Sequence, residues 1–197
     1  MGYLKHRLSE KRYSHVCSVA DECMRYSDLF SLSDSQKADL YTASLLHDIT
    51  KEEPLQEHIS ILKRNKITLP EDEMQSPLTL HARTGALLAK EKYGINGDIF
   101  SMIDAHTTGK ENMSVCEKLL FLCDFIEPKR TNPACRRLRD FFLNNLKAMP
   151  AYTALDSALL ESMDSTIRYL VDEKRPISQR TIRARNFILQ TKGYLLK

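Results

Sequence analysis

The sequence has no tryptophan and only 6 glycines and 7 prolines among its 197 residues. Since disordered and low-complexity chains are rich in glycine or proline, this scarcity indicates an ordinary folded protein. The longest apolar run, Leu119 to Cys123, is far shorter than the roughly 20 residues that a membrane helix needs. The first residues also lack the apolar segment of an export signal. We therefore expect neither a membrane span nor an export signal.

The cysteines and the net charge exclude further classes of protein. The 5 cysteines are odd in number and contain no Cys-x-x-Cys pair, which argues against a disulfide framework and against a zinc ribbon. Reduced cysteines on apolar helix faces are typical of the cytoplasm. A formal net charge of +3 is small, so it does not indicate a nucleic-acid-binding or membrane-surface protein. We expect a cytoplasmic protein with no nucleic-acid or membrane partner.

Alternating runs of β-branched residues are missing as well, and the helical period dominates. The predicted fold class is all-α, a helical bundle in one domain over residues 1–197, without repeats or an internal linker. The segment from Pro70 to Pro77 is expected to be a loop. Helices are expected near 9–28, 34–47, 54–65, 79–93, 98–106 and 114–126, with two or three more in 133–195, broken at Pro150 and Pro176.

His47 and Asp48 stand side by side at the end of an apolar helix. Adjacent helical side chains lie roughly 100° apart, so both can lean towards one metal ion. The alternative is structural, because an imidazolium is favoured at a helix C-terminus and Asp48 would then begin a loop. A dipeptide alone does not separate these interpretations.

Other histidines recur on apolar helix faces, and one aspartate lies within the most hydrophobic helix. A single buried histidine is usually satisfied by one hydrogen bond. Several of them with buried carboxylates need partners that divalent metal supplies collectively. The candidates come from five helices and include no cysteine, which favours a catalytic site over structural zinc, and their number suits two ions bridged by a carboxylate. These candidates are His15, His47, Asp48, His81, His106 and Asp124.

The order of these residues resembles the HD-domain superfamily of metal-dependent phosphohydrolases. More specifically, the sequence resembles the bacterial YqeK family of symmetrical diadenosine tetraphosphate hydrolases, with His-Thr-Thr-Gly and Asp-Phe-Ile-Glu-Pro-x-Arg as the most specific blocks. The motifs lie within 12–130, and we expect 131–197 to form C-terminal helices that complete the same HD domain. The matching segments are Arg12–His15, His47–Lys51, His81–Ala86, His106–Gly109 and Cys123–Arg130.

The resemblance implies hydrolysis of dinucleoside tetraphosphates to two nucleoside diphosphates through a metal-activated hydroxide. One metal would be held by His15, His47, Asp48 and Asp124, and a second by His81 and His106 with Asp48 as the bridge. The resemblance implies two iron ions, whereas the donor atoms alone also suit manganese, zinc or magnesium. The expected partner is a small-molecule nucleotide, and the sequence leaves open whether the chain forms a homodimer. Ala82, Cys123 and Phe125 depart from the family pattern without removing a ligand.

Basic and hydroxyl side chains beside the motifs are candidates for phosphate binding. Lys51 lies one turn beyond His47, and the Arg130 guanidinium can grip two phosphate oxygens, so we expect both to be catalytic together with Asp48. Their alternatives are a solvated lysine at a helix end and a surface pair between Arg130 and Glu127. Further candidates for substrate binding are Arg83, Thr107 and Thr108, although the threonines also suit a helix end.

The basic cluster near the C-terminus has two interpretations as well. It is either a solvated face or a surface that attracts polyphosphate. Competing functions keep the metal site but change the substrate to a nucleoside monophosphate, a cyclic dinucleotide or a guanosine polyphosphate, or make the chain a nucleotide-sensing module without catalysis. The cluster comprises Lys174, Arg175, Arg180, Arg183 and Arg185.

Overall fold

The computed structural model describes residues 2–74 and 76–191. All regular elements in this part of the chain are helical, which confirms the predicted all-α class. No helix within it combines the length and apolar character needed to cross a membrane. In chain order the elements are α1 (Gly2–Arg7), α2 (Glu10–Ser27), η1 (Asp28–Phe30), α3 (Asp34–Leu46), α4 (Leu55–Arg64), α5 (Glu71–Met74), η2 (Pro77–Thr79), α6 (Leu80–Tyr93), α7 (Gly97–Ala105), α8 (Val115–Ile126), α9 (Pro133–Ala148), α10 (Ala151–Asp172) and α11 (Gln179–Thr191).

The helix starts follow local capping chemistry. The side chains of Ser33 and Ser114 each accept a hydrogen bond from the backbone N–H three residues later. Their own backbone N–H groups donate to the side chains of Gln36 and Glu117, which completes two capping boxes. The segment expected to be a loop contains the short helix α5, which is a correction to the prediction. Thr79 precedes α6 as expected, but its hydroxyl does not cap that helix. Thr79 is the last residue of η2, and its hydroxyl donates instead to the carbonyl of Ser76.

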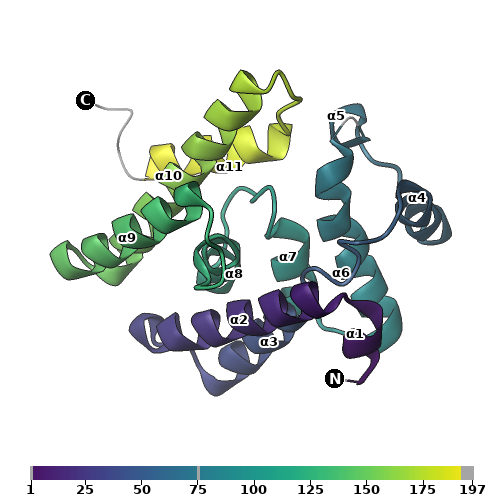
Figure 1. Cartoon of the computed structure of the whole chain (residues 1–197), viewed down its shortest axis with the longest axis horizontal. Coiled ribbons are helices and arrows are strands. Elements are labelled where there is room, and N and C mark those ends of the chain that lie inside the picture. Colours follow the sequence, from purple (N-terminus) through teal and green to yellow (C-terminus); the bar gives the residue numbers. More distant parts are fainter. Residues whose placement is uncertain (1, 75, 192–197) are drawn as a thin grey trace.

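Helix α8 lies at the centre of the molecule. In Figure 1 it is seen almost end-on, with α2 and α3 on one side and α9 and α10 on the other. It packs against all four of these helices and against α7. Helix α6 pairs with α7, and α4 covers the outer side of α6. A helix that is apolar on nearly all sides fits this position, because burial is favourable for every face.

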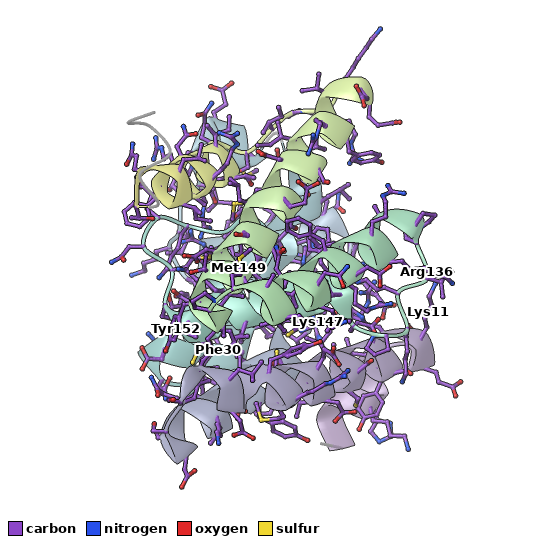
Figure 2. The ribbon with its side chains drawn as sticks, turned by 90° about the vertical axis from the view of Figure 1, so that its left-hand side faces the viewer. Lys11, Phe30, Arg136, Lys147, Met149 and Tyr152 are labelled. Carbon is purple, nitrogen blue, oxygen red and sulfur yellow. The ribbon has the colours of Figure 1, made fainter. Side chains whose placement is uncertain are left out.

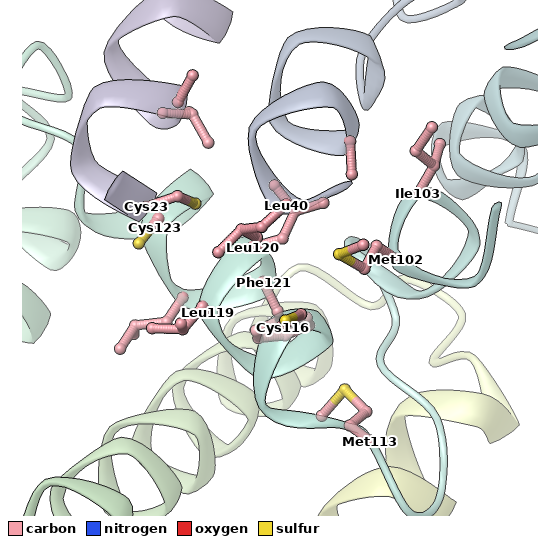
Figure 3. Packing of buried hydrophobic residues seen from close by; sticks show 14 of the residues in the cluster. Cys23, Leu40, Met102, Ile103, Met113, Cys116, Leu119, Leu120, Phe121 and Cys123 are labelled. Carbon is pink, nitrogen blue, oxygen red and sulfur yellow. The ribbon is translucent and has the colours of Figure 1, made fainter. Parts of the chain in front are cut away.

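The core between α2, α3, α7 and α8 is filled by aliphatic and sulfur-containing side chains (Figure 3). Leu40 and Leu120 meet at its centre, while Cys23 and Cys123 lie next to each other. All the cysteines are free thiols, as expected from their spacing. This core fixes the ends of α3, α7 and α8 relative to one another, and four of the candidate ligands lie at or near those ends. These four are His47, Asp48, His106 and Asp124.

The C-terminal helices attach to this core at several points. Tyr152 of α10 packs edge-on against Phe30, with ring centroids 5.2 Å apart, and both are seen at one end of α10 in Figure 2. Arg139 of α9 donates to the carbonyls of Ile126 and Glu127, each at 2.5 Å. Arg180 of α11 forms a 2.8 Å ion pair with Asp104 of α7. These contacts brace α7 and α8 close to the candidate ligands.

Candidate metal centre

The structure brings the side chains of all six candidate ligands to one place. His47 and His106 follow the last residues of α3 and α7, and Asp48 lies in the turn after α3. The three others project from within helices, and all six belong to the segments α2, the end of α3, α6, α7 and α8. They form three overlapping groups whose ligand atoms lie within 4.8 Å of one another: His15, His47 and Asp48; His47, His106 and Asp124; and Asp48, His81 and His106.

A glycine allows this convergence. A Cβ atom on Gly85 of α6 would lie 3.3 Å from the His47 carbonyl oxygen and 3.4 Å from Thr50 Oγ1. The Thr50 hydroxyl donates to the carbonyl of His81 at 2.9 Å. A Cβ atom would make tight contacts here, so glycine lets α6 approach the turn that carries His47 and Asp48 without displacing it.

The Asp48 carboxylate lies at the middle of the cluster and is 2% exposed. Its Oδ2 lies 3.7 Å from His15 Nε2 and 3.5 Å from His47 Nε2. Its Oδ1 lies 3.4 Å from His81 Nε2 and 3.6 Å from His106 Nε2. Each carboxylate oxygen therefore faces a different pair of imidazoles. Asp124 lies on the Oδ2 side, with its Oδ1 2.9 Å from His15 Nε2.

The imidazole tautomers follow from what the Nδ1 atoms face. His47, His81 and His106 place Nδ1 at 2.7, 2.9 and 2.6 Å from backbone carbonyl oxygens three residues earlier. His15 places Nδ1 3.1 Å from the Glu127 carboxylate. These oxygens only accept, so each Nδ1 carries a hydrogen, and the Nε2 atoms of His47, His81 and His106 present lone pairs to the cluster. His15 differs because its Nε2 faces a second carboxylate, that of Asp124. Burial lowers the pKa of His15, but its hydrogen bonds to Asp124 and Glu127 outweigh burial and raise that pKa above the ordinary value.

Two of these inward-facing atoms form no hydrogen bond within the described residues. They are His47 Nε2 and Asp48 Oδ1, and both are buried. The Nε2 atoms of His81 and His106 lie only 3.1 Å apart, although both are acceptors. Lone pairs this close and this buried need an electrophile between them. Imidazole nitrogens and carboxylate oxygens suit a divalent metal ion, so the residues fit such a group.

Three cations surround the cluster. Arg12 Nη1 lies 2.6 Å from Asp48 Oδ2, and Arg130 Nη2 lies 2.5 Å from Asp124 Oδ1. Burial raises the pKa of Asp124, but Arg130 and His15 outweigh it and hold that pKa well below the usual range. Lys51 Nζ lies 3.1 Å from His81 Nε2, and burial lowers the pKa of the Lys51 ammonium. Arg130 thus pairs with Asp124 rather than with Glu127.

The other substrate-binding candidates differ in where they lie. Thr107 Oγ1 lies 3.0 Å from Nε2 of both His81 and His106, inside the cluster. Thr108 is buried and its hydroxyl donates to the carbonyl of Gly109, so it serves the local turn. Arg83 forms an ion pair with Asp104, in which Arg83 Nε lies 2.6 Å from Asp104 Oδ1.

The basic cluster at the C-terminus is not a uniform solvated face. Arg180 pairs with Asp104, whose carboxylate it shares with Arg83, and Arg185 forms an ion pair with Asp164. At least these two side chains therefore serve contacts within the fold.

Sequence reasoning overlooked two residues of this site. Arg12, which contacts Asp48, precedes His15 by three residues on the same face of α2, and this helical spacing was the available signal. Glu127 follows Asp124 by three residues and accepts from His15 Nδ1, from Ser18 Oγ at 2.6 Å and from the Lys129 backbone N–H at 2.7 Å. Burial raises the pKa of Glu127, but these hydrogen bonds lower it below the ordinary value.

Residues 12–129, which include all six candidate ligands, match the model of the HD domain family. The chain belongs to the HD-domain family. Within this family it is 33% identical over 187 residues to a symmetrical bis(5'-nucleosyl)-tetraphosphatase of Halalkalibacterium halodurans, a match that covers 94% of the chain and 93% of the relative. A protein of the same name from Bacillus subtilis is 30% identical over 191 residues, covering 96% and 95%. These relatives, together with the HD-domain match, confirm the resemblance to the YqeK family.

A solved HD-domain structure supports the same assignment. It is a crystal structure from Clostridium acetobutylicum, described as an HD superfamily hydrolase involved in NAD metabolism. The chain superposes on it with a TM-score of 0.85 and 32% sequence identity over 96% of the chain and 95% of the neighbour. The likeness in fold therefore extends over almost the whole chain, including the C-terminal helices. An HD domain implies a divalent metal, in keeping with the donor atoms described above.

Proposed function

We propose that this protein hydrolyses diadenosine tetraphosphate symmetrically, giving two molecules of ADP. The observation that carries the proposal is the Asp48 carboxylate, whose two oxygens face two different histidine pairs. This arrangement suits a carboxylate that bridges two metal ions, and paired metals are a recurrent solution for phosphoryl displacement. The curated relatives named symmetrical tetraphosphatases match the chain over nearly its full length, which supports this substrate.

The metal ligands in this proposal fall into two sets. His15, His47, Asp48 and Asp124 would hold one ion, and His81 and His106 would hold the second together with Asp48. When bound, divalent metal lowers the pKa of water and neutralises charge on phosphate oxygens. We propose iron for both positions, because the YqeK family resemblance implies it and because nitrogen and oxygen donors without thiolates accept it.

The protein's own cations have a separate role in the proposal. Arg12 and Arg130 hold Asp48 and Asp124 in place, and their remaining N–H groups are available to non-bridging phosphate oxygens. The Lys51 ammonium and the Thr107 hydroxyl border the His81 side of the cluster and can donate to the same polyphosphate. Fixed donors around a buried site stabilise the charge that develops on phosphate oxygens in the transition state.

We further propose that the whole chain, 1–197, acts as one domain in the cytoplasm. The contacts of α9, α10 and α11 with the helices that carry the ligands support a single unit. The Arg139 hydrogen bonds to the end of α8 support it as well. The free thiols suit a reducing compartment.

The decisive experiment combines metal analysis with product analysis. Purified protein loaded with iron or manganese is incubated with diadenosine tetraphosphate, and the products are separated by chromatography. We expect ADP alone, and Asp48→Asn should lower the rate by at least roughly 100-fold. Asp156→Asn, which affects a carboxylate paired with Lys118 outside the cluster, is the matched control and should keep the parent rate. Formation of AMP with ATP, or full activity in Asp48→Asn, would contradict the proposal.

A further inference from the structure

A small cavity opens beside the metal centre and shares two residues with it. It has a volume of about 210 Å³, and Lys51 and His81 form the wall towards the cluster. The rest of the lining comes from the start of α4 and from the segment before α6. These remaining residues are Glu53, Leu55, His58, Pro77 and Leu78.

The surface that this cavity offers is mainly apolar. Leu55 is 43% exposed and Leu78 is 63% exposed, and they line the cavity from different elements, α4 and η2. Its polar groups away from the metal centre are already engaged: the Glu53 carboxylate pairs with Arg7 at 2.5 Å, and His58 Nδ1 lies 2.7 Å from Thr84 Oγ1. Single exposed leucines are common on protein surfaces. Two that flank a cavity bordering a polar reaction centre are a candidate contact for an apolar part of the substrate.

The size of the cavity limits its occupant. Pockets for whole drug-sized ligands span roughly 300–1,000 Å³, so about 210 Å³ suits one planar ring system rather than a complete dinucleotide. A nucleobase is such a ring, and its flat face packs well against aliphatic side chains. The phosphates attached to it would then extend along Lys51 towards His81.

A larger cavity elsewhere does not meet this requirement. It has a volume of about 620 Å³ and is lined by residues that include Gln36 and Ser114, near the starts of α3 and α8. Gln36 and His47 are separated along α3 by roughly 16 Å at 1.5 Å per residue. None of the six candidate ligands lines this cavity. A polyphosphate bound at the metal centre therefore reaches the smaller cavity first.

We infer that the cavity between Leu55 and Leu78 is the subsite for one nucleobase of the substrate. This inference rests on the proposed function, because it takes a nucleotide as the ligand of the adjoining centre. It assigns to Leu55 and Leu78 the recognition of the base, and to Lys51 the first phosphate beyond the sugar. It adds a specificity site that the metal ligands alone do not supply.

Calorimetric binding of ADP and of inorganic pyrophosphate to the metal-loaded protein tests the inference. Leu78→Ser and Leu55→Ser should each weaken ADP binding by roughly tenfold, since each removes aliphatic surface that the base would cover. Pyrophosphate, which lacks a base, should bind equally to the parent and to both variants. Leu29→Ser, at a leucine that is 49% exposed on η1, is the control and should leave both affinities unchanged. Leu78→Met keeps the apolar surface and should retain ADP binding.

Three results would overturn the inference. ADP affinity could be unchanged in both serine variants, or ADP and pyrophosphate affinities could fall together. Alternatively, Leu78→Ser could change the mass measured by light scattering, which would assign this surface to a second copy of the chain. The proposed function is judged separately by the products formed from diadenosine tetraphosphate in the parent protein. A base-dependent effect of Leu78→Ser without that hydrolysis would support the subsite and refute the proposed reaction.

Discussion

Glu127 provides the sharpest test of how the metal centre is held. It fixes His15 through Nδ1, whereas the three other candidate histidines use backbone carbonyls for this purpose. Glu127→Gln keeps the shape of the side chain but turns one oxygen into an NH₂ group. One oxygen accepts from His15, and the other accepts from Ser18 and from the Lys129 N–H. In either orientation the new NH₂ therefore opposes an existing N–H donor.

The expected magnitude follows from losing one charge-assisted partner of a metal-binding histidine. Removing such a partner typically lowers metal affinity by about 10- to 100-fold, which corresponds to about 1.4–2.7 kcal/mol. Glu127 contacts His15 but not His81 or His106, so the loss should fall on the ion held by His15, His47, Asp48 and Asp124. The second ion should keep an affinity close to that of the parent. Glu127→Ala should lose more, because it also leaves Ser18 without its acceptor.

Calorimetric metal titration with parallel metal analysis measures both sites. Glu117→Gln is a matched control, since Glu117 is also buried and hydrogen-bonded but lies at the opposite end of α8, where it pairs with Lys110. This control should lose stability without losing metal affinity. Equal metal affinities in Glu127→Gln and Glu117→Gln would refute the reasoning. A selective loss of the ion held by His81 and His106 would refute it as well.

Three further outcomes are expected. Gly85→Val should lower the free energy of unfolding by about 1–3 kcal/mol, because the new side chain meets the His47 carbonyl. Gly97→Ala places its methyl group in open space at a helix start and should raise the free energy of unfolding by about 0.4–1 kcal/mol. Urea denaturation measures both changes. Metal at about 100 times its Kd should raise the free energy of unfolding by about 2.7 kcal/mol, which corresponds to about 5–10 °C in Tm. Scanning calorimetry with and without a chelator measures this difference, and an unchanged Tm would contradict it. Burial raises the pKa of the Cys116 thiol to about 11, so this thiol stays protonated at pH 8. A thiol reagent should therefore modify only one cysteine rapidly in the folded protein, the half-buried Cys17, and all five cysteines after denaturation.

The sequence predicts the helices well because each depends on local chemistry. The capping box at Ser33 and the stop at Gly94, which adopts φ 61°, lie within a few residues of the helix ends they determine. The apolar period also places His47 and His106 correctly on the buried side. Helix α5 is missed because its single turn is too short to display a period.

Partners from distant segments are harder to predict. His15 and Glu127 are separated by 112 residues, and Arg12 and Asp48 by 36. Which basic side chain meets which carboxylate depends on how the helices pack, and the helical period carries no information about that packing. Arg130 illustrates the problem, because its nearest acidic neighbour in the sequence is Glu127, yet it pairs with Asp124.

The arginines of the C-terminal third have a consequence for protein engineering. Residues after 130 contribute none of the six candidate ligands, yet Arg139 binds the carbonyls at the end of α8 and Arg180 binds Asp104, two residues before His106. A fragment that ends at Arg130 would keep every ligand in its sequence and lose both of these supports. In a chimera with C-terminal helices from a relative, these two guanidinium groups are therefore the contacts that the graft has to reproduce.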